Sequence, residues 1–144
     1  MEPIKQRAAQ RVRIHQERFE RCAQLVEAAN EARGLAIAVN RAHRGERPAF
    51  GPDGVTDWSV LDERFHAARA RVRTLAGVLR IYGPDELAEK AEAVRKAEGA
   101  LAYARFAQDG EAAGGRPVSI PIDMRRAADG LDRAVLEFTD AARQ

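Results

Sequence analysis

The chain has 144 residues, so it is long enough for one domain that buries about two thirds of the surface exposed by its unfolded form. Hydrophobic residues make up 45% and charged residues 32%, which is typical of a globular protein and excludes a disordered or fibrous chain. The formal net charge is only +2, so charge alone does not require a nucleic-acid partner.

Cysteine content and hydropathy exclude further classes of protein. Cys22 is the only cysteine, which excludes a disulfide framework and a cysteine metal site and favours a buried thiol that packs as a small hydrophobe. The first residues carry a charge every few positions, unlike a secretory signal, and no stretch approaches the ~20 apolar residues of a membrane span. We therefore expect a cytoplasmic protein with no membrane contact.

The first predicted helix covers about residues 3–42. Its apolar positions recur at helical spacing and define one face, which Leu25, Ala32, Leu35 and Val39 widen: Val12, Phe19, Cys22, Val26, Ala29 and Ala36. Gly34 lies inside this helix at a cost of about 1 kcal/mol relative to Ala, so a kink or a close helix contact is expected there.

A loop follows over residues 43–57, with a turn at Gly51–Gly54. Thr56 and Asp57 are candidate N-caps for the next helix, and Ser59 with Asp62 is an alternative capping box. The second helix, about 58–82, carries an apolar seam at alternating steps of four and three: Leu61, Phe65, Ala68, Val72, Leu75, Leu79 and Tyr82.

The second helix ends at Gly83, and Pro84 is predicted to open the third helix, about 84–107, as its first residue. The expected inner face of this helix consists of Leu87, Ala91, Val94, Ala97, Leu101 and Ala104, with Tyr103 and Phe106 at its flanks. Because the turn at Gly83 and Pro84 is so short, these two helices must form an antiparallel hairpin.

A second loop is predicted over about 108–122, and Asp123 is expected to cap a last helix, about 123–142. The inner face of that helix is Met124, Ala127, Leu131, Ala134, Val135 and Phe138. Both loops contain short apolar segments, Pro48–Phe50 and Pro117–Ile122, which we expect to pack across the helices. The chain is thus predicted to be all-α, a single antiparallel four-helix bundle over residues 1–144 with a long first helix. The loop lengths leave open whether the first and last helices run up-down or cross over.

The first helix is too long for this bundle. At 1.5 Å per residue it would extend roughly 58 Å, against about 36 Å for each of the next two helices. Unless Gly34 bends it back, about 20 Å has no partner in the chain, and this surplus carries apolar residues. We expect Ile4, Ala8, Val12 and His15 to contact a protein partner, either a second copy in a homodimer or another protein, with His15 satisfied at a helix interface.

Basic residues define an alternative function. Lys5, Arg7, Arg11 and Arg13 crowd the N-terminal arm, and Arg69, Arg73 and Arg80 share a flank of the second helix with His66. Phosphates could bind to either surface, with an affinity that falls steeply with salt. No helix-turn-helix, zinc module or stacking set of aromatic residues accompanies them, so nucleic-acid binding is the second hypothesis.

Catalytic and metal motifs are weak. Glu63 and His66 form an E-x-x-H, but a di-iron bundle needs a second such motif, and Phe65 on the seam turns both side chains outward. No phosphate loop or nucleophile elbow occurs. We expect a non-enzymatic protein with no cofactor and no metal.

The run VRTLAGVLRIYGPDELAEKAEAV, residues 72–94, resembles uncharacterised all-helical proteins of high-GC actinobacteria. In those proteins a helix that ends in Gly-Pro is followed by an acidic first turn and an Ala-rich helix. The resemblance covers only this hairpin and implies no activity. The sequence therefore predicts a helical interaction or scaffold protein that self-associates, or docks on a protein partner, through its long first helix.

Overall fold

Four helices form the protein in a computed structural model that describes residues 4–43, 57–113 and 122–144. They are α1 (Ile4–His43), α2 (Trp58–Tyr82), α3 (Asp85–Ala113) and α4 (Ile122–Ala142), and the described residues contain no strand. The prediction of an all-α bundle with a long first helix is confirmed.

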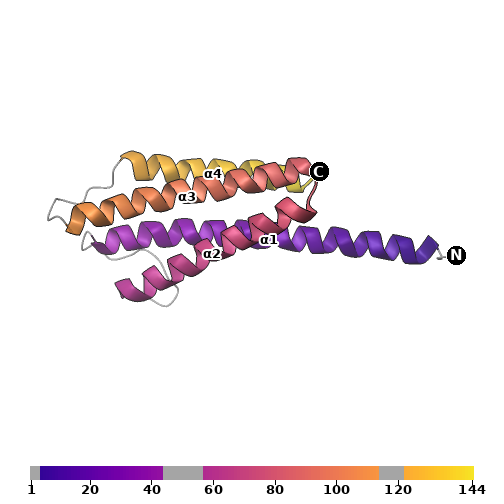
Figure 1. The fold of residues 1–144 in the computed structure, drawn as a ribbon, viewed down its shortest axis with the longest axis horizontal. Coiled ribbons are helices and arrows are strands. Elements are labelled where there is room, and N and C mark those ends of the chain that lie inside the picture. The colour runs from indigo at the N-terminus through magenta and orange to yellow at the C-terminus, as the bar shows by residue number, and fades with distance from the viewer. Residues whose placement is uncertain (1–3, 44–56, 114–121) are drawn as a thin grey trace.

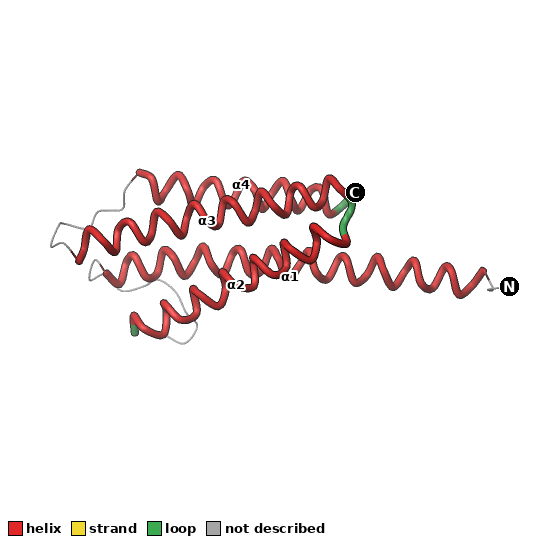
Figure 2. Tube along the Cα trace, viewed as in Figure 1, coloured by secondary structure: helices red, strands yellow, loops and turns green. Residues whose placement is uncertain are grey.

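The helices run up, down, up and down, which resolves the topology that the loop lengths left open (Figures 1 and 2). Both α1 and α3 contact every other helix, whereas the described residues of α2 and α4 do not touch each other. α2 and α4 therefore occupy opposite corners, and α1 and α3 form the shared centre of the bundle.

Small side chains on α1 let its neighbours approach closely. Ala28, Ala29, Ala32 and Ala36 are fully buried, and Leu25 and Val39 extend the same face. Larger side chains from the other helices fill the remaining volume: Phe65, Val72 and Leu79 of α2, Val94 and Leu101 of α3, and Leu131 and Phe138 of α4. Apart from Ala28, which the predicted face of the first helix did not include, these positions match the predicted inner faces. Tyr82 does not, because it lies at the last position of α2, where it lines a surface hollow beside α1 and is 71% exposed.

The predicted bounds of α2 are confirmed, and other helix ends differ from the prediction. Pro84, predicted as the first residue of the third helix, lies before α3, which begins at Asp85. Asp57 is the N-cap of α2, since its Oδ1 accepts hydrogen bonds from the Ser59 backbone N–H and hydroxyl at 2.9 and 2.8 Å. α3 continues to Ala113 instead of residue 107, because the single Gly110 costs only about 1 kcal/mol among residues that otherwise tolerate a helix. Asp123 lies inside α4, which begins one residue earlier. The predicted packing of Pro48–Phe50 and Pro117–Pro121 lies outside the described residues.

α1 is one unbroken helix through Gly34, so it does not fold back on itself (Figure 1). Its 40 residues correspond to about 60 Å, while the 25 residues of α2 correspond to about 38 Å. Its N-terminal part extends beyond the end of the bundle where α2 and α4 stop and α3 starts.

The hairpin between α2 and α3 depends on Gly83. Its N–H donates to the Leu79 carbonyl at 2.8 Å, and Pro84 stands just before α3, where its carbonyl accepts from the Ala88 N–H at 2.9 Å. A Cβ on Gly83 would lie 2.5 Å from the Leu79 carbonyl oxygen, closer than real contacts allow. The backbone approach, and not the φ angle of −87°, requires glycine here.

Gly83→Ala is expected to lower the free energy of unfolding by roughly 1–3 kcal/mol, because the turn must shift to relieve this contact. Urea unfolding followed by circular dichroism measures the loss. Gly130→Ala is the matched control, since nothing lies within 4 Å of a Cβ at this position in α4 and its expected effect is a gain of up to about 1 kcal/mol. Equal effects of the two substitutions would contradict this role of Gly83.

Candidate functional site

The overhang, residues 4–19 of α1, has no buried side chain. The four predicted partner-binding residues all lie on it: Ile4 is 86% exposed, Val12 is 56% exposed, and Ala8 and His15 are also exposed. Phe19, at the base of the overhang, is 65% exposed, and the first buried residue is Cys22. Phe19 was predicted on the covered face of α1, but it lies at the rim of the bundle beside the last turn of α4 and stays exposed. His15 is exposed as well, so the helix interface expected for it does not lie within the described bundle.

An apolar groove lies at the base of the overhang, between α1 and the last turn of α4. Phe19, Cys22, Ala23 and Val26 of α1 and Phe138, Thr139, Ala142 and Arg143 of α4 line this α1/α4 groove. Burial raises the pKa of the Cys22 thiol, although the nearby Arg18 opposes the shift. Cys22 is therefore a protonated, apolar part of the groove wall, as its prediction as a small hydrophobe requires.

The stripe of apolar residues on the overhang leads into this groove. Val12, Phe19 and Val26 are seven residues apart, as are Ala8, His15 and Cys22. Seven residues make almost two helical turns, so each set lies on one face of α1. Since the later members of both sets face α4, the earlier members lie on the same side of α1, beyond the point where α4 ends.

A second hollow lies on the other side of α1, at the end of α2. Ile14, Glu17, Arg18 and Arg21 of α1 and Leu79, Tyr82 and Gly83 line it. The Arg21 guanidinium lies over the Tyr82 ring, 5.8 Å from its centroid. Large exposed apolar side chains therefore gather at this end of the bundle, and they include Ile14, Phe19, Ile81 and Tyr82.

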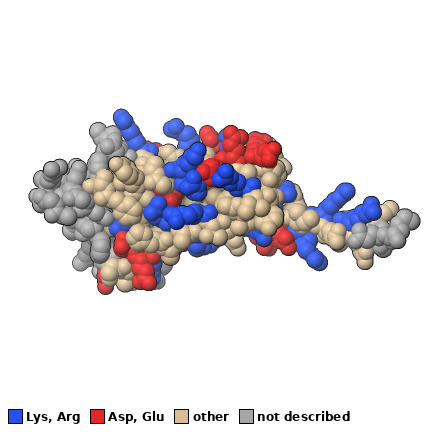
Figure 3. All heavy atoms as spheres, in the orientation of Figure 1, with Lys and Arg blue, Asp and Glu red and all other residues tan. Residues whose placement is uncertain are grey.

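Charge differs between the overhang and the end of the bundle. Residues 4–16 contain Lys5, Arg7, Arg11 and Arg13 and no acidic residue. Lys and Arg side chains line the overhang in Figure 3, and Asp and Glu side chains gather on the bundle near the same end. The acidic residues near this end include Asp85 and Glu86 in the first turn of α3 and Asp140 in the last turn of α4.

The basic residues on the flank of α2 are less accessible to phosphate than the sequence indicates. Arg69 forms an ion pair with Glu98 of α3, with Nε 2.7 Å from Oε1, and its guanidinium also lies over the Phe106 ring. Arg73 and Arg80 are exposed, but Arg80 shares a hollow with Glu89 and Glu92 of α3. Acidic side chains of α3 therefore lie beside two of the three predicted phosphate-binding arginines of α2, Arg69 and Arg80.

A buried polar layer, which the apolar pattern of the sequence did not predict, joins α2 and α3. Arg105 is 1% exposed, its Nη2 donates to Asp62 Oδ1, and its guanidinium contacts the rings of Phe65 and Phe106. Glu98 is 4% exposed beside Arg69. A signal was present, because steps of four and three along α3 place Glu98 and Arg105 on the inner seam that contains Leu87, Ala91, Val94 and Leu101.

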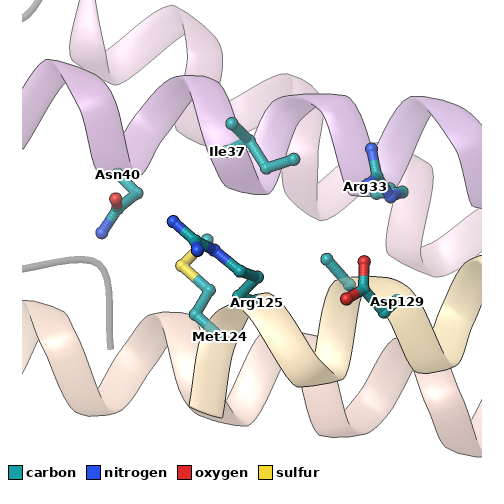
Figure 4. A pocket seen from close by; sticks show the side chains of 7 residues that line it. Arg33, Ile37, Asn40, Met124, Arg125 and Asp129 are labelled. Atoms are coloured by element: carbon teal, nitrogen blue, oxygen red, sulfur yellow. The ribbon is translucent and has the colours of Figure 1, made fainter. Parts of the chain in front are cut away.

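A mixed hollow between α1 and α4, away from the overhang, is drawn in Figure 4. Arg33, Ile37 and Asn40 of α1 and Met124, Arg125, Ala128 and Asp129 of α4 line it. Arg125 reaches toward α1 between Ile37 and Asn40 (Figure 4). Arg33 Nε lies 3.0 Å from Asp132 Oδ1, so charged side chains link the two helices along this seam.

Metal ligands do not cluster in the described residues: no group of three or more His, Cys, Asp or Glu side chains could hold an ion there. Glu63 and His66 are both exposed, as predicted. His66 lies 3.5 Å from Asp62 and stacks on Phe106, with the ring centroids 5.9 Å apart. Among the described helices, none has a stretch long and apolar enough to cross a membrane.

Comparison of the chain with protein-family models, with curated proteins and with solved structures found no match in any of the three. The resemblance of residues 72–94 to actinobacterial helical proteins stays a prediction. The geometry of the overhang and its grooves therefore carries the functional argument.

Asp62→Ala is expected to lower the free energy of unfolding by roughly 2–4 kcal/mol, because it removes the carboxylate that faces a buried guanidinium. Arg105→Met is expected to cost less, since Met keeps the contacts with the rings and leaves Asp62, whose side chain is 24% exposed, near water. Urea unfolding measures both. Glu63→Ala removes a neighbouring exposed carboxylate and serves as the control, within about 0.5 kcal/mol of the wild type. A larger cost for Arg105→Met than for Asp62→Ala would contradict this reading.

Glu98 is expected to make stability depend on pH. Desolvation raises the pKa of its carboxyl, and the opposing charges of Arg69, Arg73 and Arg95 do not reverse the shift. Between the ordinary and the raised pKa the folded chain holds a proton that the unfolded chain has lost, so stability falls as pH rises through this interval. Glu98→Gln lacks this proton exchange. Urea unfolding between about pH 4 and pH 7 should therefore show the variant gaining stability relative to the wild type as pH increases. A constant difference would exclude this contribution.

Proposed function

We propose that this protein is a non-enzymatic interaction protein that binds a protein partner, or itself, through the overhang of α1. The single observation that carries the proposal is the position of the apolar stripe. Ala8, Val12, His15 and Phe19 continue a helix face that is covered inside the bundle and uncovered outside it. A helix that carries such a stripe lowers its free energy by burying it against another helix.

The surroundings of the overhang support the same proposal. Most helical stability in proteins comes from packing of an amphipathic face, so a partner that covers the overhang would also hold it helical. The α1/α4 groove and the hollow beside Tyr82 provide apolar surface on both sides of its base. Exposed aromatic side chains such as Phe19 and Tyr82 are the type that contributes most to binding energy at protein interfaces.

Nucleic-acid binding is the alternative, and the overhang is the surface that supports it. Lys5, Arg7, Arg11 and Arg13 lie on consecutive turns and give this segment four positive charges. The α2 part of that hypothesis has less support, since Arg69 is engaged with Glu98. A complex with nucleic acid would weaken steeply with salt, whereas burial of an apolar stripe would not.

Val12→Glu is expected to abolish partner binding, because it places a charge in the middle of the stripe. It should leave the melting temperature of the isolated bundle unchanged, since Val12 lies outside the bundle. Gln10→Glu is the matched control: it adds the same charge to the overhang, on the opposite face. Two readouts are needed, light scattering behind a sizing column over a range of concentrations and capture from an extract of the source cell by the immobilised chain.

Loss of binding in Val12→Glu but not in Gln10→Glu would support the proposal, whichever readout detects the partner. If both variants behave as the wild type in both readouts, the overhang is not the binding surface and the proposal is wrong. A shift of labelled nucleic acid in a gel that both variants retain and that salt removes would favour the alternative.

A further inference from the structure

The apolar stripe of the overhang has the width of a contact with one other helix. Ala8, Val12, His15 and Phe19 follow one another at steps of four, three and four, and a further step of three reaches Cys22 in the α1/α4 groove. Two such residues in every seven form a narrow strip that pairs with a single helix, and inside the bundle that helix is α4. The overhang therefore presents the same strip beyond the point where α4 ends (Figure 1).

Cations border this stripe. Arg11 comes directly before Val12 and Arg18 directly before Phe19, so the two arginines lie on the same edge, seven residues apart. Arg11 is exposed, and Arg18 is half-buried at the base of the overhang. In paired helices, the residues that border the apolar strip meet those of the facing helix, and their charges determine which helix is accepted.

The charge of Arg11 is not offset within α1. The residues four positions away are Arg7 and His15, and those three positions away are Ala8 and Ile14, so no acidic residue lies at the spacing of a helical ion pair. Like charges four residues apart destabilise a helix, and Arg7 and Arg11 form such a pair. Carboxylates on a facing helix would reduce this repulsion.

We infer that the partner is another protein, which docks an amphipathic helix with an acidic edge on the overhang. The inference rests on the proposed function and specifies its partner. The apolar stripe of the docked helix covers Ala8, Val12 and His15, and its acidic edge faces Arg11. Ile4 to Phe19 extends about 22 Å, so the docked helix needs about four turns. A second overhang lacks this edge, since residues 4–16 contain no acidic residue.

The stripe also distinguishes such a helix from other polyanions. A nucleic acid would pair with the cations and leave the apolar stripe in water. A lipid surface favours a broad apolar face rich in Trp, Phe and Leu. The stripe is narrow, holds Ala8 and His15 beside Val12, and has its one aromatic ring, Phe19, at the base. These side chains suit the close contact of two helices.

Two synthetic peptides, tested against the full chain, examine this inference. Both carry leucine at the apolar positions of about three heptads, one with glutamate and the other with lysine along both edges. The like charges keep each peptide from pairing with itself. Fluorescence anisotropy of the labelled peptides should show the wild type binding the glutamate peptide about tenfold or more tightly than the lysine peptide. Val12→Glu should abolish binding of both.

A charge reversal locates the contact. Arg11→Glu should weaken binding of the glutamate peptide about fivefold or more and strengthen binding of the lysine peptide, because an attraction becomes a repulsion. Arg13→Glu is the matched control: it makes the same change of charge on the other side of α1, away from the stripe, and should stay within about twofold of the wild type. Both positions are exposed on the overhang, so thermal unfolding should be unchanged in both variants.

Three results would overturn the inference. One is a wild type that binds neither peptide or does not distinguish them. Another is equal weakening by Arg11→Glu and Arg13→Glu, which indicates general attraction between charges. The third is a different occupant: a dimer, or binding to vesicles of phosphatidylcholine and phosphatidylglycerol, that Val12→Glu abolishes. The proposed function would survive if light scattering or capture still detects a protein partner that Val12→Glu loses. It fails separately if Val12→Glu changes nothing.

Discussion

One helix is longer than the helices that cover it, and the architecture follows from this mismatch. α1 runs unbroken from Ile4 to His43, while α2 and α4 end at Tyr82 and Ala142, beside the middle of α1. Inside the bundle its face is lined by alanines that let three neighbours approach. Outside the bundle the helix faces solvent with an apolar stripe and a row of cations. Residues that would be core residues in a longer bundle thus become surface residues.

The turn at Gly83 sets where α2 ends, and the polar layer between α2 and α3 favours one alignment of these two helices. Gly83 permits the Leu79 carbonyl to approach closely, which stops α2 and returns the chain at once into α3. Asp62 with Arg105, and Arg69 with Glu98, then link these helices at two levels along their length. Buried charged pairs of this kind contribute little net stability and work best when a single register satisfies them, so they favour one alignment of the hairpin.

The polar layer reduces the exposed positive charge on α2, whereas the overhang keeps its positive charge exposed. The polar layer draws Arg69 into the bundle, whereas Lys5, Arg7, Arg11 and Arg13 of the overhang lie in a stretch, residues 4–16, that has no acidic residue. The same segment carries the apolar stripe. The partner proposed for this segment would therefore meet apolar surface and positive charge together.

Helical periodicity alone determined much of this protein. Apolar residues at steps of three and four identified all four helices, most of their buried faces and the surplus length of the first, because burial repeats with the helical turn. Periodicity also indicates that Glu98 and Arg105 face the core, since both lie on the inner seam of α3. Glu98 and Arg105 are not predicted as core residues when the core is assigned from apolar residues alone, because their ion-pair partners lie on another helix.

Only the tertiary structure decided what lies opposite each face. The positions of Phe19 and His15 fit the core pattern, yet both are exposed, because burial depends on where α2 and α4 end in space and not on the sequence of α1. Asp62 finds Arg105 across 43 positions of the chain, and the direction of α4 along α1 depends on how the helices pack. Contacts between segments far apart in the chain are set by packing in three dimensions, which a one-dimensional pattern does not encode.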